Sequence, residues 1–206
     1  MKKIKDLFVT HRVFKIFKWA ILIIVGLFIV LIVVRTFHYF DVQKTNDQVL
    51  KIHSTKLSLS DVFGENLPAD PGLEADKTIQ GIDANNNGIR DDVELAIYKE
   101  YPNSAKTRAV LLQYALVLQM ETTQPFVNEE IATATAEKGS QSYDCIGEIV
   151  PISDNDLEEI ENYRNFIKII QLNTLERKNM KENFNNKTRS FQLKSGCDID
   201  LSKLPN

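Results

Sequence analysis

An uncharged apolar run near the N-terminus limits the possible folds of this chain more than any other feature. Residues 19–34 read "WAILIIVGLFIVLIVV" and contain no charged side chain. A helix over these 16 residues is about 24 Å long, and extending it to Tyr39 reaches the roughly 30 Å of a hydrocarbon core. Arg35 would then extend its side chain toward the headgroups. The run predicts one transmembrane helix over residues 19–39.

The charges around this run predict its orientation. Residues 1–40 carry seven Lys or Arg and one Asp, and Lys18 directly precedes the run. Positive charge favours the cytoplasmic side, and Trp19 and Tyr39 stand where aromatic side chains meet the two membrane surfaces. The sequence therefore predicts a cytoplasmic basic tail over residues 1–18, with everything after the helix outside the cytoplasm.

Three other readings of the N-terminal region were weighed. A cleaved signal peptide shares the basic start and the apolar core, but the following "RTFHYFDVQ" lacks the small residues of a cleavage site. A buried core helix would need partners on every face of an apolar cylinder. The basic run "KKIKDLFVTHRVFKIFK" could also lie on anionic lipid as an amphipathic helix, although the same charges explain topology more simply. An uncleaved signal anchor in the inner membrane, facing a periplasm or comparable exterior, is the favoured prediction.

The rest of the chain is acidic. Residues 41–206 carry 18 basic and 27 acidic residues. Such a balance repels phosphate backbones, so nucleic acid is excluded as a partner and a cation is favoured. We expect the membrane, through residues 19–39, and an envelope protein as partners, and the sequence leaves the oligomeric state open.

Helical patterns dominate the region outside the membrane, and no segment alternates with a period of two. Residues 40–72 are polar, with no sustained period, and predict a stalk with at most a short helix near residues 49–57. Residues 73–206 predict an external all-α domain, a small helical bundle. Asp156 with Glu159 three residues later fits a capping box. The expected helices cover residues 91–100, 105–120 as the central helix, about 129–138, and 156 to about 178, with or without a kinked continuation to 186.

The two cysteines agree with an oxidising exterior. Cys145 and Cys197 both follow the apolar run, on the side where disulfides persist. A bond between them would close a loop of 53 residues, which the chain-entropy model values at about 4 kcal/mol. Two separate buried thiols are the alternative, because sequence does not show whether the two residues come within reach.

One short stretch has the composition of a metal site. Residues 83–94 read "DANNNGIRDDVE". A hard dication takes six to eight oxygen ligands. Short Asp or Asn side chains at alternate positions of a tight turn converge on one point. A Glu at the end of the loop completes the coordination sphere with its two oxygens. Gly88 stands where such a turn needs an open dihedral. The candidate ligands are Asp83, Asn85, Asn87, Ile89 through its carbonyl, Asp91 and Glu94.

This pattern resembles the EF-hand-like calcium loops of extracellular proteins, of the dockerin and thrombospondin type 3 kind. The resemblance covers twelve residues of 206. It implies side-chain ligands at places 1, 3 and 5, a carbonyl at place 7, a direct or water-mediated ligand at place 9 and a bidentate Glu94 at place 12. Arg90 at place 8 and the lack of a second loop depart from paired sensor EF-hands, which indicates a lone structural site.

The loop carries three formal negative charges, from Asp83, Asp91 and Glu94, with Arg90 nearby. This charge predicts a dissociation constant for Ca²⁺ on the order of 10⁻⁵ to 10⁻³ M, the range of extracellular modules. The alternative is an Asn-rich turn that caps a helix without metal.

No other chemistry stands out. The three His have no Cys, His or carboxylate at metal-ligand spacing, and no nucleophile or phosphate loop occurs in a recognisable context. We therefore predict a membrane-anchored, calcium-binding helical module that binds or scaffolds envelope components and is not an enzyme. A calcium-responsive regulator is the alternative, and an enzyme with a cleft of scattered acids ranks below both.

Overall fold

The computed structural model describes residues 2–205, with side chains from residue 17 onward. The chain forms two units, Met1–Asp47 and Gln48–Asn206. The described residues contain no β-strand, which confirms the all-α prediction. Short 3₁₀ turns occur at Gly72–Asp76 (η1) and Leu201–Lys203 (η2). The α-helices are α1 Lys2–Ser54, α2 Leu59–Phe63, α3 Asp91–Glu100, α4 Ala105–Thr123, α5 Glu129–Gly147, α6 Asp156–Gln171 and α7 Leu175–Lys187.

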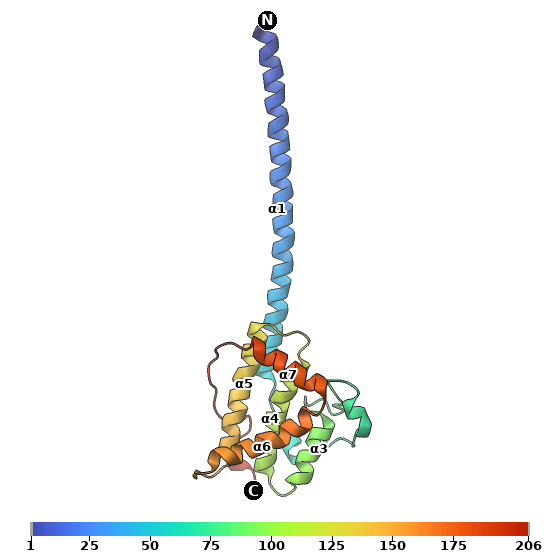
Figure 1. Ribbon diagram of the computed structural model, residues 1–206, viewed down its shortest axis with the longest axis vertical. Coiled ribbons are helices and arrows are strands. Elements are labelled where there is room, and N and C mark those ends of the chain that lie inside the picture. The colour runs from blue at the N-terminus through green and yellow to red at the C-terminus, as the bar shows by residue number, and fades with distance from the viewer. Residues whose placement is uncertain (1, 206) are drawn as a thin grey trace. The chain divides into compact units, whose positions relative to one another are not determined.

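The first unit consists of the N-terminal part of α1, a single continuous helix (Figure 1). The segment Phe17–Ser54 of α1 is long and apolar enough to cross a membrane, with a mean hydropathy of 2.9 in its most apolar window, and no part of that window is buried in the protein. An apolar helix that the rest of the protein leaves exposed is consistent with a membrane anchor. The expectation of an apolar helix near the N-terminus is confirmed.

The region expected to be a polar stalk, residues 40–72, differs from that prediction. Helix α1 continues to Ser54, because no Gly or Pro interrupts residues 41–63. Ile52, Leu57 and Val62 are buried, and Leu57 and Val62 belong to the main core of the second unit. The folded domain therefore includes segments well before residue 73. The apolar side chains of residues 40–72 are too widely spaced in the sequence to show a helical or strand period.

Helix α4 is the centre of the second unit, as its apolar circumference predicts (Figure 1). It contacts α2, α3, α5, α6 and α7. The Ser104 side chain caps its first turn by accepting from the Thr107 N–H. The helix passes the predicted end at Met120 and stops at Thr123, because the residue before Pro125 disfavours helical geometry.

Helices α3 and α5 begin where the sequence places them. Helix α3 covers the predicted residues 91–100. The Asn128 side chain caps α5 by accepting from the Ile131 N–H. Helix α5 extends to Gly147, nine residues past the expected end at Lys138, because Cys145 and Ile146 pack into the core. Tertiary burial outweighs the weak helix preference of the Gly and Ser residues in that segment.

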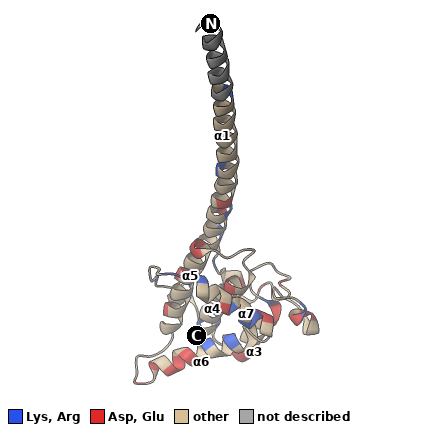
Figure 2. Ribbon diagram, turned by 45° about the horizontal axis from the view of Figure 1, so that its top comes forward, with Lys and Arg blue, Asp and Glu red and all other residues tan. Residues whose placement is uncertain are grey.

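The fourth predicted helix begins at Asp156 as expected, but it is not continuous to residue 178 and its predicted capping box is wrong. It divides into α6 and α7, and α7 ends at Lys187, next to the residue 186 expected for a kinked continuation. The Thr174 side chain caps the new start by accepting from the Arg177 N–H. The N-cap of α6 is Asn155, whose carbonyl accepts from the Glu159 N–H, so Asp156 is the first helical residue and no capping box forms. The carboxylates in the first turn of α6 instead stabilise the helix, because they lie at the positive end of its dipole (Figure 2).

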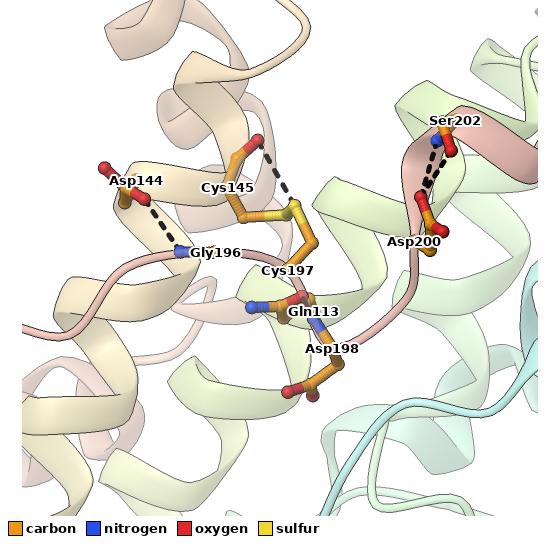
Figure 3. Close-up of a disulfide and its surroundings, with 8 residues drawn as sticks. All are labelled: Gln113, Asp144, Cys145, Gly196, Cys197, Asp198, Asp200 and Ser202. Atoms are coloured by element: carbon orange, nitrogen blue, oxygen red, sulfur yellow. Dashed lines mark hydrogen bonds between the residues drawn. A yellow bond between two sulfur atoms is a disulfide. The ribbon is translucent and has the colours of Figure 1, made fainter.

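The C-terminal tail lies against α4 and α5 (Figure 3). The expected disulfide between Cys145 and Cys197 is present, with Cα atoms 4.9 Å apart. On either side of it, the Gly196 N–H donates to Asp144 at 2.8 Å and the Asp198 N–H donates to the Gln113 side chain at 2.8 Å. The Asp198 carboxylate in turn accepts from the Leu57 N–H at 3.1 Å. The disulfide thus ties the tail and the segment after α1 to the same core.

Candidate metal site

The candidate metal loop, residues 83–94, is a tight turn that leads into α3. The Asp91 N–H donates to the Ile82 carbonyl at 2.9 Å and closes the turn. Gly88 has a φ of 84°, and a Cβ there would lie 2.8 Å from the Leu116 side chain on α4. Asn86 is the one non-glycine residue with positive φ among the described residues, which Asn tolerates better than most. The backbone conformation and the neighbouring α4 both require glycine at place 6.

Short polar side chains fold back into this turn. The Asp83 carboxylate accepts from the N–H groups of Asn87 at 3.1 Å and Gly88 at 2.9 Å. The Asn85 Oδ1 accepts from the Asn87 N–H at 3.3 Å, and the Asn87 Oδ1 accepts from the Ile89 N–H at 2.9 Å. These bonds hold the side chains of places 1, 3 and 5 on the inner side of the turn.

Glu94 closes the loop from the first turn of α3. Its side chain is buried, with 1% of the residue exposed. Asn85 Nδ2 donates to Glu94 Oε2 at 3.0 Å, and Asn87 Nδ2 donates to Glu94 Oε1 at 3.2 Å. The structure therefore brings together Asp83, Asn85, Asn87 and Glu94, four of the six residues that the sequence singles out.

The remaining two candidates have other positions. The Asp91 carboxylate, also 1% exposed, accepts from the Ala84 N–H at 3.0 and 3.2 Å and so faces the start of the loop. The Ile89 side chain is fully buried in the core next to α4, which fixes the backbone at place 7. Arg90, expected beside the site, is fully buried and pairs with Asp92, so its charge is balanced outside the turn.

The surroundings of the loop disfavour the ionised form of two of its carboxylates, Glu94 and Asp91. Burial raises the pKa of Glu94 to about 7, and the charges of Asp61 and Asp91 act in the same direction, while the amide hydrogen bonds oppose the shift. Burial likewise raises the pKa of Asp91, with a further contribution from Asp83. Within residues 17–205, none of the ion pairs involves Asp83, Asp91 or Glu94. Carboxylates gathered without a cation are costly in a buried position.

Two neighbours of the loop, Asp61 and Asn66, were missed by sequence reasoning. Asp61 on α2 accepts from Asn87 Nδ2 at 3.4 Å, and the Asn66 carbonyl accepts from Asn85 Nδ2 at 3.2 Å. The Ser58 and Asp61 pair forms a capping box, a pattern that could have predicted α2. No local pattern predicts that α2 packs on a loop more than twenty residues later in the chain, because that contact is tertiary.

No family model, no curated relative and no solved structure matches the chain. Among the described residues, no group of three or more His, Cys, Asp or Glu side chains is arranged to hold a metal ion. The turn at residues 83–94 differs from such a group because two of its converging side chains are the amides of Asn85 and Asn87.

Proposed function

We propose that this protein is a membrane-anchored, calcium-binding module that binds or scaffolds components of the cell envelope. The anchor is the apolar part of α1, and the helical unit from Gln48 onward carries one EF-hand-like Ca²⁺ site in residues 83–94. The proposed orientation places residues 1–18 in the cytoplasm and the helical domain in the periplasm or a comparable exterior, which agrees with the positive-inside rule and with the disulfide.

The observation that carries the proposal is the buried Glu94 carboxylate, held between the amides of Asn85 and Asn87. Its hydrogen-bond partners are neutral, and the carboxylates of Asp61 and Asp91 repel its negative charge. A dication at this point would offset that repulsion, and hard oxygen donors suit Ca²⁺.

The donor set fits calcium. Asp83, Asn85, Asn87 and Glu94 would hold the ion with their side chains, and a planar Asn amide exchanges its nitrogen for its oxygen by a half-turn. By the resemblance, the Ile89 carbonyl and Asp91 would complete the set. The ion would supply positive charge and rigidity to the turn that begins α3, which is a structural role.

Calcium binding is tested by unfolding the full chain in detergent micelles, with Ca²⁺ and with chelator. At a free Ca²⁺ concentration about 100-fold above the Kd, we expect an increase of about 2.7 kcal/mol in the free energy of unfolding. The double substitution Asp83→Ala with Glu94→Ala should abolish this increase. The matched control is Asp154→Ala with Glu158→Ala, which removes two exposed carboxylates far from the loop in sequence and should keep the increase. A wild type that Ca²⁺ does not stabilise would contradict the proposal.

The membrane orientation and the scaffolding role need separate measurements. A reporter enzyme active only outside the cytoplasm, fused after Asn206, should be active, and the same enzyme fused before Met1 should be silent. Crosslinking of the full-length protein in intact cells should recover envelope components, and fewer of them with the loop variant. A silent C-terminal fusion would refute the orientation, and crosslinking that recovers no envelope component would refute the scaffolding role.

A further inference from the structure

We propose that the calcium site extends beyond the twelve-residue loop, and that the Asp61 carboxylate on α2 supplies a further oxygen ligand. The ion would then fasten α2 to α3, two helices that are separate in the sequence. This inference rests on the proposed calcium site and assigns it one additional residue.

The position of Asp61 is the first support. Its Oδ2 accepts from the Ser58 N–H at 2.9 Å, the cap that begins α2. Its Oδ1 faces the loop and is 3.4 Å from Asn87 Nδ2, which also donates to Glu94. Asp61 therefore contacts a side chain on the inner side of the turn, at place 5, rather than the outer surface of the loop.

The rigidity of α2 is the second support. The Tyr98 hydroxyl on α3 donates to the Asp61 carbonyl, and the Arg108 Nε on α4 donates to the Val62 carbonyl at 3.1 Å. Gly64, the C-cap of α2, lies so close to α3 that a Cβ there would be 2.8 Å from the Tyr98 ring. A carboxylate on a helix whose C-terminal end is held by α3 and α4 keeps its position, which limits the ordering cost of binding.

The charge balance is the third support. Asp61 joins Asp83, Asp91 and Glu94 as a fourth carboxylate, and none of the four belongs to an ion pair formed by residues 17–205. Burial of Glu94 to 1% exposure lowers the local dielectric and strengthens both the repulsion among these groups and their attraction to a dication. Four negative charges also predict a tighter site than the three of the loop alone.

The position of α2 directly after α1 determines what a ligand on α2 would do for the structure. Four residues separate the end of α1 at Ser54 from the start of α2 at Leu59. A calcium ion shared by α2 and the loop would tie the chain that leaves the anchoring helix to the folded domain. Depletion of external calcium would loosen this connection, whereas an ion held by the loop alone would leave α2 unaffected.

The test is calorimetric titration of the full chain in detergent micelles with Ca²⁺. Asp61→Asn removes the charge but keeps an oxygen that can cap α2, and it should weaken Ca²⁺ binding by roughly 10- to 100-fold. Glu65→Gln removes an exposed charge four residues away and should leave the Kd within about twofold of the wild type. Circular dichroism at 222 nm checks that both variants keep the helical fold.

Hydrogen exchange of the wild type provides a measurement that needs no variant. Ca²⁺ should slow exchange in peptides covering residues 58–66 as well as residues 83–94. Equal affinities of Asp61→Asn and wild type, or protection confined to residues 83–94, would overturn the role of Asp61 while leaving the calcium loop intact. A wild type that binds no Ca²⁺ would instead overturn the proposed site itself.

Discussion

Removal of the Cys145–Cys197 disulfide should destabilise the domain by about 4 kcal/mol, the loop-closure entropy of a crosslink between residues 52 positions apart. The closed loop contains α6 and α7, so the unfolded chain gains the freedom of two whole helices when the bond is absent. For a domain of this size, the loss corresponds to a fall of roughly 8–16 °C in Tm. The tail keeps its hydrogen bonds to Asp144 and Gln113, and these hold the reduced form near its native structure at low denaturant.

The assay is urea unfolding of the full chain in micelles, with and without a thiol reductant, followed by circular dichroism at 222 nm. Reduction should shift the midpoint of the wild type to lower urea. It should leave the double variant Cys145→Ala with Cys197→Ala unchanged, since that variant has no bond to lose. Equal midpoints for oxidised and reduced wild type would refute the reasoning, because the loop-closure term would then be absent.

Three further predictions concern the buried Arg177, two glycines with positive φ and the exposed Asp76. Arg177→Met leaves three backbone carbonyls without their buried donor and should lower the free energy of unfolding by about 3 kcal/mol or more, measured by urea titration; a loss below 1 kcal/mol would contradict it. Gly88→Ala and Gly196→Ala each place a side chain at a positive φ, which should lower the free energy of unfolding by roughly 1–2 kcal/mol. Only Gly88→Ala also brings a Cβ against the Leu116 side chain on α4, so it should lose more stability in urea titration. Equal losses for the two variants would contradict this. Hydrogen bonds from Asn173 and Arg177 lower the pKa of Asp76, so its stabilising contribution is present at neutral pH and is lost as the pH falls through the lowered pKa. The stability gap between wild type and Asp76→Asn should therefore shrink as the pH falls below the ordinary Asp pKa of about 4 and through the lowered pKa, and a gap that grows on acidification would show the opposite sign.

Local signals in the sequence predicted the elements whose causes are local. The apolar run from Trp19 predicted its helix because hydropathy and length are properties of consecutive residues. Helix α3 and the starts of α4 and α5 match their predicted ranges. The structure shows that Ser104 and Asn128 cap α4 and α5, and such caps act on their immediate neighbours. The twelve-residue pattern at Asp83 predicted the turn, and four of its six candidate side chains converge, since residues of one loop are close in sequence.

Errors arose where distant residues decide the local structure. The segment before residue 73 looked like a stalk because its apolar side chains are sparse, yet Leu57 and Val62 complete a core built by α4. At the break between α6 and α7, the buried Arg90 donates to the Gln171 carbonyl at 3.0 Å, a contact between residues 81 positions apart that adds to the local Thr174 cap.

The sequence by itself determined the helical class, the apolar N-terminal helix and the acidic turn, because each depends on residue type and short spacing. The two cysteines lie 52 positions apart, so only the tertiary structure decided that they come within bonding distance. Only the tertiary structure decided which helix covers that turn. Packing of Tyr98 and Arg108 against the backbone of α2 brings Asp61 to a loop more than twenty residues away. Such contacts depend on the shape of the assembled core, and the residues that make them have no fixed separation in the chain.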